Sequence, residues 1–150
     1  MSDLSTLYQE VILDHAKRPR NFHIIENADH KANGYNPLCG DKVTIYLKLV
    51  DDRIADISFE GTGCAISTAS ASILTETLKG KTRAEAAALF EDFHKMVTGQ
   101  ELKPSTAPAL GKLKVFCGVS EFPVRVKCAS LAWHTLRSAL EGNANVTSTE

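Results

Sequence analysis

Apolar and polar residues alternate along residues 42–50, which is the spacing of a strand with one buried face. Apolar positions resume after the turn residues at 51–53 and continue to Phe59, so the two runs predict a β-hairpin. A shorter alternation over residues 113–119 predicts a third strand. Residues 20–38 contain Asn, Gly and Pro without a regular period, and we expect a loop there.

Four other stretches carry the signals of helices. In the first, residues 4–16, apolar side chains recur three or four positions apart, and Pro19 ends the pattern. The second stretch is rich in Ala and Ser and follows the glycines at 61–63, and its small side chains would let a helix lie close to the sheet. Two more helices are predicted over 84–97 and 124–140, after a capping box (Thr82, Glu85) and Pro123 respectively.

These elements predict a single α+β domain over residues 1–150, in which a small three-stranded antiparallel sheet packs with four to five helices. The chain shows no internal repeat and no domain boundary. Residues from about 142 to 150 are small and polar, and we expect a disordered tail there.

Composition excludes several classes of protein. The formal net charge is −1, and no block of Lys and Arg is long enough for a nucleic-acid surface. No apolar run approaches the roughly 20 residues of a membrane span, and the N-terminus lacks the pattern of a signal peptide. We therefore expect a cytoplasmic protein with neither a membrane nor a nucleic-acid partner. Its four cysteines should be reduced, which favours metal binding or sulfur chemistry over disulfides.

The stretch N-P-L-C-G-D at residues 36–41 places a thiol and a carboxylate two positions apart. Residues i and i+2 of an extended segment point to the same side. Gly40 gives the backbone freedom to aim Cys39 and Asp41 at one point. A C-x-D pair is common by chance, so this stretch alone does not establish a site.

Two further cysteines lie at predicted helices. Cys64 follows two glycines at a strand end, so we expect it near a helix N-terminus, where unpaired N–H groups favour a thiolate; the alternative is a tight turn with a packed Cys64. Cys128 falls on the inward face of the last helix, where a core cysteine is the usual interpretation. Arg125 falls in the same sector, and a buried guanidinium needs an anion such as a thiolate. Alternatively, Arg125 reaches water around the helix end.

Together, these side chains supply three sulfur donors and one oxygen donor, which is a complete ligand set for zinc: Cys39, Asp41, Cys64 and Cys128. No C-x-x-C pair is present, so the site would be assembled from the ends of three separate elements. The fourth cysteine, Cys117, lies in the predicted third strand and is expected to pack there. Its role is left open.

Three motifs occur jointly and in the order of a known family. The stretches N-P-L-C-G-D, G-T-G-C-A-I-S-T-A-S-A-S and R-V-K-C-A-S-L-A-W resemble the IscU/SufU-type iron–sulfur cluster assembly proteins, related to the NifU N-terminal domain, over residues 4 to about 141. Two features resemble the SufU branch. Lys127 stands where scaffold members have a histidine ligand, and the stretch from about Gly80 to Leu113 is longer than in scaffold members.

The resemblance implies an α+β fold and a zinc site formed by Cys39, Asp41, Cys64 and Cys128. It also implies that Cys39 accepts sulfur from the persulfide of a SufS-type cysteine desulfurase, a pyridoxal-phosphate enzyme, and supplies downstream cluster-assembly machinery. Arg125 would support the site or the docking.

The predicted function is therefore that of a zinc-dependent sulfurtransferase. In this hypothesis, zinc protects Cys39 at rest, and docking on the desulfurase loosens that bond so that the glycine-hinged loop swings out. The principal alternative is a scaffold on which the same ligands hold a [2Fe–2S] cluster that is passed to apo-proteins. A purely structural zinc domain fits less well, because such sites usually close with four tightly held sulfur or nitrogen ligands.

Overall fold

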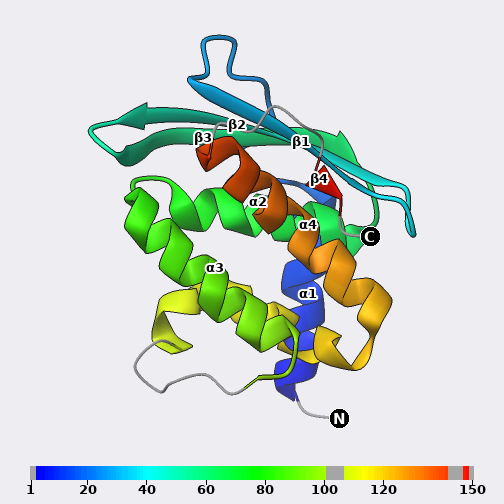
Figure 1. Ribbon diagram of the computed structural model, residues 1–150. Coiled ribbons are helices and arrows are strands. Elements are labelled where there is room, and N and C mark those ends of the chain that lie inside the picture. The colour runs from blue at the N-terminus through cyan, green and yellow to red at the C-terminus, as the bar shows by residue number, and fades with distance from the viewer. Residues whose placement is uncertain (1–2, 101–106, 142–146, 149–150) are drawn as a thin grey trace.

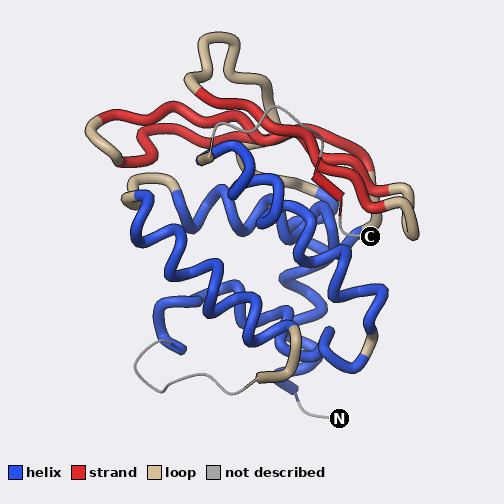
Figure 2. Tube along the Cα trace, in the orientation of Figure 1, coloured by secondary structure: helices blue, strands red, loops and turns tan. Residues whose placement is uncertain are grey.

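Helices cover one face of a β-sheet in this protein (Figures 1 and 2). The computed structural model describes residues 3–100, 107–141 and 147–148. Along the chain the elements are α1 (Asp3–Lys17), β1 (His30–Asn36), β2 (Asp41–Val50), β3 (Arg53–Thr62), α2 (Ala65–Leu78), α3 (Arg83–Val97), the 3₁₀-helical segment η1 (Ala107–Glu121), α4 (Pro123–Leu140) and β4 (Thr147–Ser148). The predicted α+β fold is confirmed.

Three antiparallel strands form most of the sheet, in the order β3–β2–β1, and the two-residue β4 pairs with β1 in parallel. The hairpin of β2 and β3 is the one that the alternation predicts, with Asp51 and Asp52 at positive φ in its turn. The rest of the tail, predicted to be disordered, lies outside the described residues.

The third antiparallel strand is not the one predicted. Residues 30–36, expected to lie in a loop, form β1 and pair with β2 along their whole length. The inward-facing residues of β1 are small or polar, so no apolar alternation marks this strand: Ala32, Gly34 and Asn36. A Cβ at Gly34 would overlap the side chain of Thr135 on α4, so glycine lets β1 lie directly against that helix.

Residues 113–119 do not form the predicted strand but belong to η1. The segment is kinked at Gly111. After the kink, Leu113, Phe116 and Val119 are buried at the three-residue repeat of a 3₁₀ helix, and Val115 is buried beside them. Cys117 is consequently exposed rather than packed, and the prediction of a packed Cys117 is wrong.

Helices α2 and α4 lie against the sheet, and α1, α3 and η1 pack around them (Figure 1). Small side chains bring α2 close to α4, where Ser70 Oγ donates to the carbonyl oxygen of Ala129 at 2.6 Å. Trp133 of α4 is fully buried and stacks on Phe93 of α3, with ring centroids 5.0 Å apart. The capping box predicted for α3 is present. Among the helices in the described part of the chain, none combines the length and apolarity needed to cross a membrane.

Candidate metal centre

The turn between β1 and β2 carries Cys39 at one end of the sheet. Asn36 ends β1 and Asp41 begins β2, and the two residues pair next to the turn. Gly40 N donates to the Asn36 carbonyl oxygen at 2.8 Å. Gly40 has a φ of 71°, a left-handed conformation that glycine adopts without strain. Cys39 is exposed, and its neighbour Leu38 is 58% exposed. The thiol of Cys39 therefore stands on a short, accessible loop.

Three side chains from different elements converge beside this loop. The Sγ atoms of Cys39 and Cys128 lie 3.3 Å apart. Together with a carboxylate oxygen of Asp41, they place three ligand atoms within 4.8 Å of one another. Asp41 begins β2, and Cys128 lies in the second turn of α4; both side chains are buried, whereas Cys39 is exposed. The structure thus brings together three of the four predicted ligands.

The fourth, Cys64, is the N-cap residue of α2, in agreement with its predicted position. Its backbone N–H donates to Asp41 Oδ1 at 2.8 Å, and its Sγ accepts from the backbone N–H of Ser67 at 3.4 Å. The Sγ atom lies 4.0 Å from Asp41 Oδ2 but does not belong to the group of three. Cys64 is therefore joined to the centre through Asp41.

Gly63 allows the start of α2 to approach the carboxylate of Asp41. A Cβ at this position would lie 2.6 Å from Asp41 Oδ1, well inside van der Waals contact. The glycine before Cys64 is consequently a packing requirement of the site.

Asp41 is a buried carboxylate, and both of its oxygens accept hydrogen bonds. Oδ1 accepts from the backbone of Cys64, and Oδ2 accepts from Asn36 Nδ2 at 3.1 Å. The same nitrogen donates to Cys128 Sγ at 3.5 Å. Sequence reasoning missed Asn36, although this residue opens the N-P-L-C-G-D stretch that carries Cys39 and Asp41.

The electrostatics of the cluster favour a cation. Burial raises the pKa of the Cys128 thiol, and its hydrogen bonds with Cys39 and Asp41 raise it further. Several anions this close repel one another unless a positive charge lies among them. A divalent metal ion reverses this balance, because it stabilises coordinating thiols in the deprotonated form.

The donor atoms fit a zinc ion in kind and spacing. With Zn–S distances of about 2.3 Å and Zn–O distances of about 2.1 Å, a tetrahedral ion separates its donors by about 3.6–3.8 Å. The observed separations of 3.3 Å between Cys39 and Cys128 and 4.0 Å between Cys64 and Asp41 lie on either side of this range. Thiolate ligands also suit iron–sulfur clusters.

Comparison with known proteins gives the family. The family described as NifU-like N terminal domain matches residues 7–129. The chain belongs to this family. It is 41% identical to the iron–sulfur cluster assembly scaffold protein IscU of Streptococcus pyogenes serotype M1, over 97% of this chain and 89% of that protein. It is also 41% identical to the zinc-dependent sulfurtransferase SufU of Bacillus subtilis strain 168, over 93% and 92% of the two chains.

A solved structure agrees with this membership of the NifU-like N terminal domain family. A crystal structure of a proposed scaffold protein for the SUF system of iron–sulfur cluster assembly, from Fervidobacterium islandicum AW-1, superposes with a TM-score of 0.83 at 40% identity. The match covers 90% of this chain and 97% of the other. The predicted resemblance to IscU/SufU-type proteins is confirmed.

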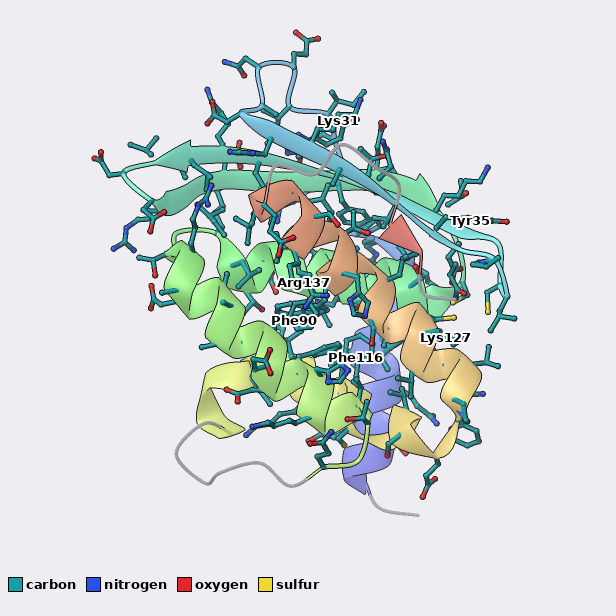
Figure 3. All side chains as sticks on the ribbon, viewed as in Figure 1. Lys31, Tyr35, Phe90, Phe116, Lys127 and Arg137 are labelled. Carbon is teal, nitrogen blue, oxygen red and sulfur yellow. The ribbon has the colours of Figure 1, made fainter. Side chains whose placement is uncertain are left out.

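Arg125 does not point into the centre of this NifU-like domain. It is exposed in the first turn of α4, and its guanidinium lies over the ring of Phe122, 4.5 Å from the centroid. Helical spacing predicts an inward direction, but the first turn of α4 is open to solvent, as the 49% exposure of Val124 shows. The inward orientation was wrong, and a supporting role for Arg125 stays a prediction. Lys127, half-buried on the same helix, precedes Cys128 directly (Figure 3).

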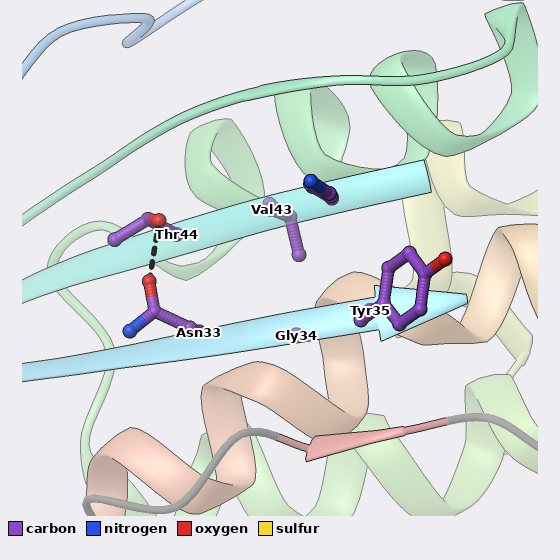
Figure 4. Close-up of a pocket in the computed structure, with 6 residues that line it drawn as sticks. Asn33, Gly34, Tyr35, Val43 and Thr44 are labelled. Carbon is purple, nitrogen blue, oxygen red and sulfur yellow. Dashed lines mark hydrogen bonds between the residues drawn. The ribbon is translucent and has the colours of Figure 1, made fainter. Parts of the chain in front are cut away.

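An open hollow of about 440 Å³ lies along β1 and β2 (Figure 4). Six residues line it: Asn33, Gly34, Tyr35, Lys42, Val43 and Thr44. Thr44 Oγ1 donates to Asn33 Oδ1 at 2.7 Å across the two strands. None of the six is a thiol, a carboxylate or an imidazole, so these side chains offer no ligand set for a transition metal.

Proposed function

We propose that this protein is a zinc-dependent sulfur acceptor that takes persulfide sulfur from a cysteine desulfurase for iron–sulfur cluster assembly. One observation carries the proposal: the converging groups differ in exposure. Asp41 and Cys128 are buried in regular elements, whereas Cys39 stands exposed on a hairpin loop. Cys64 is exposed as well, but it is held as the N-cap residue of α2. Cys39 is the exposed thiol that a loop carries, which leaves it accessible to a partner protein and able to move.

Four residues would hold the zinc ion, namely Cys39, Asp41, Cys64 and Cys128. Bound zinc would keep the sulfur atoms deprotonated at neutral pH without redox chemistry of its own. The chain supplies the rest: the backbone N–H of Cys64 and the amide of Asn36 hold the carboxylate of Asp41 in place.

The transfer step is a displacement at sulfur. The Cys39 thiolate attacks the outer sulfur of the desulfurase persulfide, the S–S bond of that persulfide breaks, and the desulfurase cysteine leaves as a thiolate. One S–S bond forms for each one broken, so the step needs neither oxidant nor reductant. Cys39 then carries the sulfur as its own persulfide. The flexible residue Gly40 next to Cys39 supports this motion of the loop.

Exposed apolar side chains on the elements that carry the site support docking of a protein partner. Leu38 precedes Cys39 in the loop, and Val124 lies four residues before Cys128 on α4. Phe122, at the N-cap of the same helix, is 47% exposed. Side chains of this kind mark protein-binding surfaces when they gather together.

A scaffold for an iron–sulfur cluster, such as a [2Fe–2S] cluster, is the second candidate. The Streptococcus pyogenes relative is named an iron–sulfur cluster assembly scaffold protein, and this chain is as identical to it as to the Bacillus subtilis sulfurtransferase. The same three thiols and carboxylate would serve as cluster ligands. The two functions differ in the metal that the protein retains and in the species that Cys39 delivers.

Elemental analysis combined with a desulfurase assay tests the proposal. We expect one zinc ion per purified chain and stimulation of a SufS-type desulfurase. Stimulation should disappear after treatment with a chelator and return when zinc is added back. Zinc-free protein that forms a stable visible absorption on anaerobic loading with iron and sulfide, and that does not respond to zinc, would favour the scaffold instead.

A further inference from the structure

We propose that Asn36 is a positioning residue of the metal centre, whose amide donates to Asp41 and Cys128 and holds these two ligands side by side. The inference rests on the proposed zinc site and extends it to a residue that is not itself a ligand.

The hydrogen bonds of Asn36 are directed at two of the candidate ligands. Nδ2 lies 3.1 Å from Asp41 Oδ2 and 3.5 Å from Cys128 Sγ. A primary amide nitrogen carries two N–H groups, so it can donate one to each neighbour. A carboxylate only accepts hydrogen bonds, and this requirement places the nitrogen of the amide, not its oxygen, toward Asp41.

The backbone of Asn36 reinforces this arrangement. Asn36 is the last residue of β1 and pairs with Asp41 across the hairpin. Its carbonyl oxygen accepts from Gly40 N, which closes the loop that carries Cys39. One residue therefore anchors the base of the loop through its backbone and two ligands through its side chain. The ligands Asp41 and Cys128 can stay in place while the loop above them moves.

The burial of Asn36 makes these bonds difficult to replace. Its side chain is fully buried, so water does not have free access to the two acceptors. Asn36 Oδ1 is also buried and has no hydrogen-bond partner in the described part of the chain. A buried unpaired acceptor is unfavourable for folding. The side chain is therefore poorly suited to a purely stabilising role, and its useful contribution is the pair of donors.

Outer hydrogen-bond partners of metal ligands typically change metal affinity or activity by about 10- to 100-fold when removed. The variant Asn36→Leu keeps the branched shape of the side chain and removes both donors. Asn33→Leu is the matched control, because Asn33 is on the same strand, is exposed on the opposite face and accepts a hydrogen bond from Thr44 through its side chain.

The experiment measures zinc binding to each protein by competition with a chromophoric chelator, with zinc alone as the probe. Cobalt substitution reports the ligand geometry by its visible spectrum, and melting of the metal-free proteins reports the fold. We expect the zinc affinity of Asn36→Leu to fall about 10- to 100-fold and its cobalt spectrum to change. Asn33→Leu should match the wild type in both.

Unchanged zinc affinity and cobalt spectrum in folded Asn36→Leu would overturn the proposal, since a residue that only closes the hairpin would affect melting alone. If Asn36→Leu does not fold, Asn36→Ser decides, because its hydroxyl is too short to reach both acceptors. A loss of zinc affinity in Asn36→Ser supports the proposal, and wild-type affinity refutes it. Failure of the wild-type protein to bind zinc would instead refute the proposed function, and with it the premise of this inference.

Discussion

The Sγ atoms of Cys39 and Cys128 lie 3.3 Å apart although the two residues are 89 positions apart along the chain. One thiol belongs to an exposed loop and the other to the buried face of a helix. The contact therefore joins an accessible group to a fixed one, and Asp41 completes the group of three from the start of β2. In a centre built in this way, the thiol of Cys39 can leave the metal while the surrounding fold stays intact.

The variant Cys39→Ser is expected to abolish sulfur acceptance while leaving the fold intact. Cys39 is exposed, so its replacement removes the nucleophile without opening a cavity. Transfer of radiolabelled sulfur from a cysteine desulfurase measures acceptance, and circular dichroism checks the fold. Cys117→Ser is the control, because Cys117 is also exposed but lies outside the group of three ligand atoms. Labelling of Cys39→Ser at the wild-type level would contradict the assignment.

The variant Gly63→Ala should disturb the centre through packing alone. The added Cβ would meet Asp41 Oδ1 at 2.6 Å, so Asp41 or the start of α2 must move. Overpacking of this kind costs about 1–3 kcal/mol of unfolding free energy, and we expect weaker zinc binding with it. Urea denaturation and chelator competition measure the two effects. Gly118→Ala, where an added Cβ meets nothing within 4 Å, should change neither.

Much of the fold could be predicted from the sequence because its signals are local. Alternation gives the β2–β3 hairpin, and the capping box gives the start of α3. Leu113, Val115 and Val119 satisfy the alternating pattern of a strand, which predicts the wrong element for η1; Phe116 is buried as well and fits a repeat of three. The sequence does not predict β1, because its inward-facing residues are small or polar and therefore do not form an alternating hydrophobic pattern.

The site could be predicted less completely because it depends on contacts between distant segments. The motifs name Cys39, Asp41 and Cys128, yet only the packing of β1 on α4 brings Cys128 to the hairpin. Asn36 acts through its side chain in three dimensions, and no rule of spacing gives that direction. Arg125 shows the converse: helical spacing predicts an inward direction, but residues 123–125 in the first turn of α4 are exposed.

The variant Thr82→Ala should lower stability without affecting the centre. Thr82 Oγ1 accepts from Glu85 N at 3.1 Å, and Glu85 Oε1 accepts from Thr82 N at 3.0 Å, so the two bonds form a reciprocal capping box at the N-terminus of α3. Loss of an N-cap side chain costs about 0.5–2 kcal/mol. Urea denaturation should show this loss with zinc affinity unchanged. A parallel fall in zinc affinity would mean that α3 and the metal centre are coupled.

His15 should make the stability of the metal-free protein depend on pH. Its side chain is buried between α1 and α2, where Nδ1 lies 2.7 Å from Ser72 Oγ. Burial lowers the pKa of His15 below its ordinary value of 6.5; Arg20 and Lys112 lower it further, while Glu76 and Asp14 oppose them. Because the folded state prefers the neutral imidazole, its stabilising effect is complete above pH 6.5 and is lost as the pH falls through the lowered pKa.

Urea denaturation between about pH 5 and 8 compares the wild type with His15→Gln, which cannot be protonated in this range. We expect the unfolding free energy of the wild type to fall more steeply on acidification than that of the variant. His134 also has a pKa lowered by burial, but it is present in both proteins and cancels in the difference. The exposed residue His23 supplies the control His23→Gln, which should follow the wild type. A constant difference between wild type and His15→Gln at every pH would show that His15 stabilises the fold only by packing.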